Sequence, residues 1–245
     1  MKRLLTTAAG LLILASLVTA PPAAADSETK AEKKYSKEMS EDAERAMKAG
    51  TVLDEMMNAD DHAIPEDLLE RATGIAVIPH VVKGAMGVGG RYGKGLVATR
   101  GENGIWHAPS FVHVGGASWG LQFGVEAADL ILVFTEADGV EALMEDKLKL
   151  GGSAGVAAGP LGRHAEIGMN VTMDSGIYSY SRSKGLFAGV AIEGAVLTID
   201  DDANARVYGE DKTAEQIVDS HAYPAPVKPF MDAVKRHSPA IKIRS

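Results

Sequence analysis

An alternating, glycine-rich segment at residues 176–199 constrains the fold more than any other part of the chain. Residues 177–182 alternate between two kinds of side chain, which is the period-two pattern of a strand with two different faces. One face takes Ile177, Ser179 and Ser181, and the other takes Tyr178, Tyr180 and Arg182. Gly185 and Gly189 follow, and glycine inside strand sequence indicates bending or a close approach of another backbone. The segment therefore predicts at least two strands in residues 176–199.

Glycines recur in a second strand-rich region, residues 83–124. The region contains strand-like runs at residues 95–99 and 110–114. A short, continuous apolar run at residues 75–78 precedes it and predicts a buried strand. The glycines do not form a nucleotide-binding loop, because neither a Gly-Lys-Ser/Thr ending nor a GxGxxG fingerprint occurs. The whole chain has 27 glycines but only 5% aromatic residues, which favours closely packed strands over a bundle of long helices. We expect bent, mainly antiparallel β structure.

Helices are expected at three places. Residues 40–58 carry apolar side chains at roughly helical spacing, residues 64–73 begin with a proline and two carboxylates that suit a helix start, and residues 136–148 follow a Thr-Glu cap. The apolar stripe of residues 40–58 packs on its own domain in one interpretation and contacts a membrane in another. The predicted fold is α+β, with a sandwich-like or barrel-like core, N-terminal helices and one internal helix.

The N-terminus has the composition of an export signal. Lys2 and Arg3 precede an apolar stretch, and the small residues Ala23 to Ala25 suit a cleavage site. An uncleaved membrane anchor is the alternative. We therefore expect an exported, periplasmic protein, with peripheral association with a membrane as one interpretation.

Charge and cysteine content exclude several classes of function. The net charge of −8 argues against nonspecific nucleic-acid binding. The chain has no cysteine, so it has no disulfide, no zinc–thiolate site and no thiol nucleophile. No serine stands in a recognisable arrangement with a base, and no catalytic residue, metal site or cofactor is predicted.

The sequence contains two weak metal-binding patterns. Asp200, Asp202 and Asn204 resemble the start of a calcium loop, but Ala205 replaces the required glycine, and an acidic turn is the preferred interpretation. His107 and His113 would lie on neighbouring strands, and solvent-facing or hydrogen-bonded histidines are preferred there over a metal pair.

Basic residues in three places are the candidate contacts for an anionic lipid surface. Arg182 and Lys184 are expected on one side of an extended chain, where alternating serines would help to hold a phosphate. A half-exposed strand whose charges pair with nearby acids is the alternative. The full set of candidate lipid-binding residues is Lys30, Lys33, Lys34, Lys37, Arg182, Lys184, Lys228, Lys235 and Arg236. For the last three, a helix and tail packed on the domain is the alternative.

Ordered sequence blocks across residues 64–220 resemble the SYLF domain family. They are Ala72–Pro79, Gly115–Gly124 with Asp129, Gly159–Arg163, Ser179–Gly189, and Asn204 with Tyr208 and Gly209. The resemblance implies a non-enzymatic, membrane-associated domain that binds phosphatidylinositol lipids in eukaryotic members and actin in fungal members. It also links membrane contact to a basic, amphipathic N-terminal helix, and it supplies no catalytic residue.

These observations together predict a bacterial envelope protein that binds anionic lipid without catalysis. A structural or protein-interaction module in envelope assembly or stress response is the alternative. Envelope proteins are possible partners, whereas nucleic acid is not expected and actin is not expected for an exported protein. The predicted organisation is a signal peptide at 1–25, a charged helical segment at 26–61, the SYLF-like domain at 62–220 and a basic tail at 221–245.

Overall fold

The computed structural model describes residues 22–59, 63–86, 88–118, 124–145, 147–151, 155–162, 176–190, 192 and 194–239. Met1–Lys37 and Glu38–Ser245 form two compact units, and the contacts described below lie within the second. The first 21 residues of the predicted signal peptide lie outside the described residues. Residues 22–25 belong to the first helix, and the cleavage of the signal stays a prediction.

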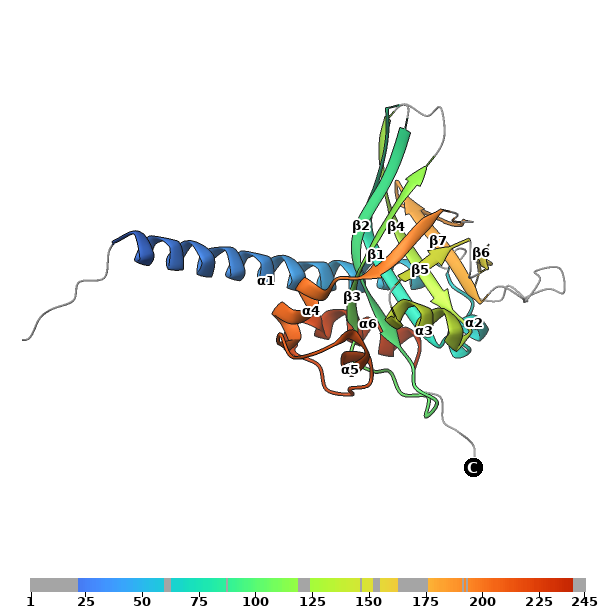
Figure 1. Cartoon of the computed structure of the whole chain (residues 1–245). Coiled ribbons are helices and arrows are strands. Elements are labelled where there is room, and N and C mark those ends of the chain that lie inside the picture. The colour runs from blue at the N-terminus through green and yellow to red at the C-terminus, as the bar shows by residue number, and fades with distance from the viewer. Residues whose placement is uncertain are drawn as a thin grey trace, which may run out of the picture. The chain divides into compact units, whose positions relative to one another are not determined.

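The chain folds as a mixed α+β structure built on one large, nearly closed sheet, as predicted (Figure 1). The strands are β1 Gly74–Met86, β2 Val88–Thr99, β3 Ser110–Ser118, β4 Gly124–Phe134, β5 Lys147–Leu150, β6 Val156–Ala158, β7 Ile177–Ser183, β8 Leu186–Gly189 and β9 Ala195–Ile199. Their order is β5-β9-β3-β2-β1-β4-β7-β6, and β8 also pairs with β7. Among the strand pairs of the described residues, only β6–β7 is parallel.

Helices flank the sheet at both ends of the sequence. They are α1 Pro22–Met57, α2 Glu66–Glu70, α3 Ala137–Glu145, α4 Asp201–Tyr208, α5 Ala214–Val218, the 3-10 helix η1 Ala225–Val227 and α6 Lys228–His237. The helices predicted at residues 40–58, 64–73 and 136–148 correspond to α1, α2 and α3. Three further helices, α4 to α6, follow β9.

Side chains on the two faces of the sheet enter two different cores. In β1, Ile75 and Val77 join one apolar cluster, whereas Ala76 and Ile78 join the other. The same alternation runs through β7, where Tyr178 enters the first cluster. A strand that is covered on both faces has apolar residues at successive positions, which explains why residues Ile75–Ile78 are all apolar.

The first core is closed by helices from opposite ends of the sequence. In α1, Ala46, Ala49 and Leu53 are fully buried at helical spacing, so the stripe packs on its own domain. In α6, Phe230 and Val234 are fully buried in the same cluster. The alternative of a packed helix is therefore confirmed for residues 228–237, and the basic appendage predicted for residues 221–245 is wrong over these residues.

A buried ion-pair network joins α1 to α4. Asp42 is 1% exposed and pairs with Arg206 at 2.7 Å and with Arg45 at 3.0 Å. Arg45 also pairs with Asp200 at 2.9 Å. Burial opposes ionisation of the Asp200 carboxyl, but the guanidinium of Arg45 and the ammonium of Lys94 outweigh it and lower its pKa. The network fixes α4 against the N-terminal helix.

Asp200 caps a helix, so the acidic turn preferred for residues 200–204 is wrong. Its carboxylate accepts a hydrogen bond from the Ala203 amide, which satisfies a free donor at the start of α4. Asn204 accepts from the Phe111 amide at 2.9 Å and donates to the Ser110 hydroxyl at 2.9 Å. The side chain of Asn204 therefore joins α4 to β3.

Candidate functional site

The candidate site lies where β1, β4 and β7 meet the turn between β7 and β8. β1 contains a bulge between Ile78 and Val81, because three steps along β1 oppose two steps along β4. His80 lies in the bulge with φ 53°, a left-handed conformation that is costly for a residue with a side chain. Its amide donates a hydrogen bond to Asp129 Oδ1 at 2.9 Å, which holds the bulge against β4.

Glycines in β2 make room for this bulge. A Cβ on Gly95 would lie 2.1 Å from the Val77 carbonyl oxygen, and one on Gly93 would lie 2.9 Å from Ile78 and Val81 side-chain atoms. The expectation that glycines mark close backbone approaches is confirmed at these two positions. The sequence thus shapes the site through residues on a neighbouring strand.

Arg182 and Lys184 lie at the same pocket but not on one extended strand, so the predicted geometry is wrong. Lys184 and Gly185 form the two-residue turn between β7 and β8, with φ 51° and 81°. Positive φ at both central residues is typical of a type I′ turn. With His80 and Asp129, these residues line an outer pocket of about 170 Å³.

Arg182 is held by neighbours on three sides. It pairs with Glu55 of α1 and lies 3.5 Å from Asp129 Oδ2, its register partner on β4. Its guanidinium also lies over the Phe187 ring, 5.4 Å from the centroid. The alternative of a strand whose charges pair with nearby acids therefore describes Arg182. Lys184 is exposed at the tip of the turn.

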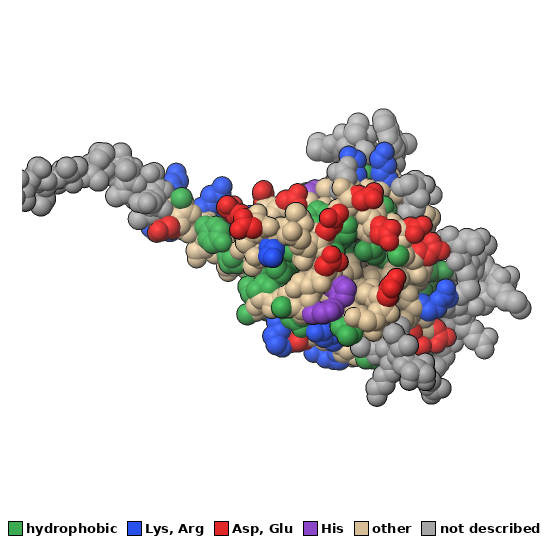
Figure 2. Space-filling model, turned by 60° about the horizontal axis from the view of Figure 1, so that its bottom comes forward, with side chains coloured by type: hydrophobic (Ala, Val, Ile, Leu, Met, Phe, Trp, Pro, Cys, Tyr) green, Lys and Arg blue, Asp and Glu red, His purple; other side chains and the backbone are tan. Residues whose placement is uncertain are grey.

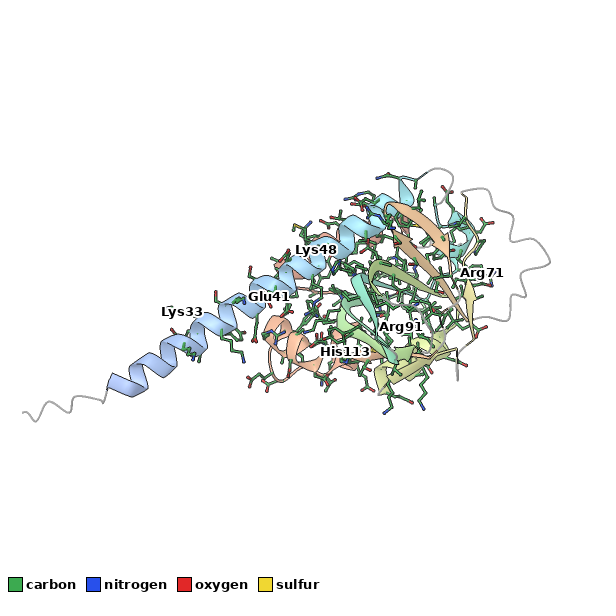
Figure 3. All side chains as sticks on the ribbon, turned by 90° about the horizontal axis from the view of Figure 1, so that it is seen from above. Lys33, Glu41, Lys48, Arg71, Arg91 and His113 are labelled. Carbon is green, nitrogen blue, oxygen red and sulfur yellow. The ribbon has the colours of Figure 1, made fainter. Side chains whose placement is uncertain are left out.

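An inner pocket of about 260 Å³ adjoins the outer one, and both are lined by Ala128 and Asp129. Its basic residues are Lys83 and Arg91, which are direct register partners on β1 and β2 (Arg91 is labelled in Figure 3). Its further lining residues are Val81, Leu130, Ser181, Ser183, Val190 and Ile192. Lys83 and Arg91 were not predicted as site residues. Lys83 precedes Met86 by three residues and Arg91 follows Val88 by three, so a hairpin between β1 and β2 is the sequence signal that could have paired them.

The other predicted basic residues lie elsewhere. Lys30, Lys33, Lys34 and Lys37 are exposed on α1 within the first compact unit. On α6, Lys228 pairs with Asp232, Lys235 bonds the Tyr223 hydroxyl, and Arg236 pairs with Asp54. Arg236 and Arg182 thus bind consecutive residues of α1, Asp54 and Glu55. Lipid contact by any of these residues stays a prediction.

A larger pocket of about 510 Å³ lies between α2, α3 and the end of β2. Glu70, Glu102 and Glu141 line it and would repel an anion. Its Arg100 is already engaged, because it lies 4.4 Å from the Trp106 ring centroid and donates to the Glu70 carbonyl. Acidic side chains are also prominent on the face shown in Figure 2, with lysine and arginine at its margins. This pocket is therefore a poor match for an anionic ligand.

Neither metal pattern forms a cluster in the part of the chain that the structure describes, where no group of three histidine or carboxylate residues could hold an ion. His107 lies against His221, with ring centroids 4.6 Å apart, and its Nδ1 lies 2.5 Å from the Val218 carbonyl oxygen. His113 lies beside Tyr92. Among the same described residues, no helix is long and apolar enough to cross a membrane.

The fold and site define a mixed α+β domain whose notable surface feature is a pair of cationic pockets. Comparison with known proteins gives the family: residues 115–237 match the Ysc84 family model, described as "Las17-binding protein actin regulator". The chain belongs to this family, which is the SYLF family that the sequence blocks resemble.

Curated relatives come from fungi and animals. LAS seventeen-binding protein 3 of Saccharomyces cerevisiae is 37% identical over 169 residues, covering 68% of this chain and 37% of the relative. SH3 domain-containing YSC84-like protein 1 of Mus musculus is 35% identical over 179 residues, covering 71% and 52%. The chain thus matches about half or less of each relative's length. These relatives are named as binding or SH3 domain-containing proteins, not as enzymes.

Proposed function

We propose that this domain is a non-catalytic module that binds anionic membrane surfaces through the turn between β7 and β8. The observation that carries the proposal is the lysine at position 184, which adopts φ 51° in an exposed turn. Asn-Gly is strongly preferred in a type I′ turn, and a side chain such as lysine costs about 1–2 kcal/mol in the left-handed region. A residue that is unfavourable for the fold supports a role in binding.

The neighbours of Lys184 suit the interface of a bilayer. Leu186 is 71% exposed, which is the largest exposure among the exposed large apolar side chains of the described residues. An exposed cation beside an exposed apolar side chain can contact headgroups and acyl chains together. The chain as a whole is acidic, so attraction to an anionic surface must be local and must fall off within a Debye length of about 8–10 Å.

Replacing Lys184 with asparagine should strengthen the fold and weaken membrane binding. The Asn-Gly turn should raise the free energy of unfolding by about 0.5–1 kcal/mol, because asparagine tolerates positive φ. Loss of one lysine near an anionic surface should weaken vesicle binding about fivefold, which corresponds to about 1 kcal/mol. Thermal unfolding and co-sedimentation with phosphatidylglycerol vesicles at low salt measure the two effects.

The control for this experiment is Lys212→Gln, which removes one exposed positive charge outside the turn. It should bind vesicles as the unchanged protein does. Equal vesicle binding by the Lys184 variant and the unchanged protein would contradict the proposal. Replacing Leu186 with serine should also weaken binding, and the weakening should persist at high salt because it does not depend on charge.

A protein-interaction module is the second candidate function. The names of the relatives favour it, since the family description and the yeast relative both refer to binding of Las17. If the unchanged protein does not bind vesicles, and if the Lys184 variant still binds a protein partner, this second function replaces the first.

The proposal includes an exported, periplasmic location in a bacterial envelope, which rests on the predicted signal at residues 1–25 alone. Mass spectrometry of the N-terminus from a periplasmic fraction tests this location. A mature chain that begins at Asp26 would support it, whereas retention of the whole chain in the cytosol would reject it.

A further inference from the structure

The inner pocket contains a charge arrangement that the sheet itself does not explain. Lys83 and Arg91 lie directly opposite each other on β1 and β2. Like charges at directly opposite positions of an antiparallel pair destabilise the sheet. Both residues also line one pocket, which places their charges at a shared space. An anion between them would turn this repulsion into attraction.

The guanidinium of Arg91 is poorly satisfied by the protein. Its Nε is buried and has no hydrogen-bond partner, and a buried donor without a partner destabilises the fold. Burial also lowers the pKa of Arg91, because desolvation disfavours the charged form. Among the described side chains, no carboxylate lies within ion-pair distance of Lys83 or Arg91. A bound anion would accept a hydrogen bond from the Arg91 Nε and would stabilise the charged form of its guanidinium.

One carboxylate, that of Asp129, is among the described residues that line the pocket. Its Oδ1 accepts a hydrogen bond from the His80 amide, and its Oδ2 lies 3.5 Å from Arg182. Its charge is therefore directed to groups outside the Lys83–Arg91 pair. Glu126 is the register partner of Lys83 on β4, and its side chain lies outside the described residues. Arg91 is therefore the residue at which phosphate binding is tested.

Size and chemistry limit the ligand class. A volume of about 260 Å³ is below the range of about 300–1,000 Å³ that is usual for drug-sized ligands. Ser181 and Ser183 add hydroxyl groups to the wall, while Leu130 and Ile192 supply an apolar side. Arginine recognises tetrahedral phosphate oxygens through its fork of N–H donors, and lysine adds a point charge.

We propose that the pocket of Lys83, Arg91, Ser181 and Ser183 binds a phosphate monoester group. This site is separate from the proposed contact of the β7–β8 turn with a membrane, and either could exist without the other. The same chemistry could come from a free phosphate monoester or from the terminal phosphate of a lipid headgroup. The experiment therefore has one arm for each source.

In the first arm, inorganic phosphate and glycerol 3-phosphate are titrated into the full chain by calorimetry at constant ionic strength. We expect saturable binding that Arg91→Gln weakens about tenfold or more, since a hydrogen bond to a charged group contributes about 1.5–3 kcal/mol. Lys149→Gln removes an exposed charge on β5 and is the matched control. It should leave binding unchanged.

In the second arm, the same proteins are mixed with vesicles of phosphatidylcholine containing phosphatidic acid. Arg91-dependent binding of free phosphates supports a soluble ligand, and Arg91-dependent binding of these vesicles alone supports a lipid phosphate. Absence of Arg91 dependence in both arms overturns the site. So does an equal loss with Lys149→Gln.

Folding of the variants is checked by circular dichroism, and Ser181→Ala provides a second variant that keeps both charges. If Arg91→Gln does not fold, Ser181→Ala must weaken binding in the arm that shows it, or the proposal fails. Because Lys184→Asn should not affect the free-phosphate arm, failure of the membrane proposal and failure of this one are distinguishable.

Discussion

Replacing Gly95 with alanine should prevent the protein from forming its native sheet. The new Cβ would lie 2.1 Å from the Val77 carbonyl oxygen and 2.7 Å from the Ile78 Cα. Both are backbone atoms of the central strand β1, which pairs with β2 on one side and β4 on the other. They cannot move without breaking ladder hydrogen bonds. The cost should therefore exceed the range of about 1–3 kcal/mol that is usual for overpacking.

Gly115→Ala is the matched control for this substitution. Gly115 lies in β3, and a Cβ built there has nothing within 4 Å. An alanine at an open strand position should be neutral or stabilise by up to about 1 kcal/mol. Urea unfolding followed by far-ultraviolet circular dichroism compares the two variants. If both unfold at the same urea concentration as the unchanged protein, the tight approach of β1 and β2 is not present in solution.

The sequence predicted the faces of the strands well because the side-chain period is a local property. The alternation in residues 177–182 predicted which side chains share a face, and Ile177 and Tyr178 do enter opposite cores. The fully apolar run at residues 75–78 predicted a strand covered on both faces. These patterns need no knowledge of what lies on either side of the strand.

Tertiary contacts explain the predictions that were wrong. Positive φ at Lys184 has no strong local signal, because lysine is not a usual turn residue at that position. The helix cap of Asp200 on the Ala203 amide is local, but Arg45 and Phe111, both distant in sequence, contact Asp200 and Asn204 and hold the helix in place. A sequence window contains neither partner.

The cationic inner pocket depends on the register in which β1 pairs with β2. The alternation of side chains along each strand does not determine this register. Lys83 and Arg91 become neighbours only in the register that pairs Met86 with Val88, and this register shifts between Val82 and Val77, across the bulge at His80. Such a bulge is coupled to Gly93 and Gly95 on the facing strand. The fold class could be predicted from local patterns, whereas the site required the pairing of particular residues.

Asp42→Ala should destabilise the domain by about 3 kcal/mol or more. Asp42 is 1% exposed and neutralises Arg206, which is 16% exposed, and Arg45, which is 10% exposed. Removing one partner of a buried ion pair typically costs about 3–5 kcal/mol, because it leaves an uncompensated buried charge. Arg45 would retain Asp200 and Arg206 would retain Glu38 at 4.0 Å, but Arg206 would lose the carboxylate that accepts its 2.7 Å hydrogen bond.

The same helix provides the control. Lys48 and Glu44 pair at 2.7 Å, but their side chains are 58% and 53% exposed, so Glu44→Ala should cost no more than about 0.5 kcal/mol. The double substitution Asp42→Leu with Arg206→Met should recover part of the stability lost by Asp42→Ala, since it removes both buried charges. Urea unfolding of the three variants compares the loss of a buried charge, the loss of an exposed ion pair and the removal of both buried charges. Equal stability of the Asp42 and Glu44 variants would mean that the network is solvated and does not hold α4 against α1.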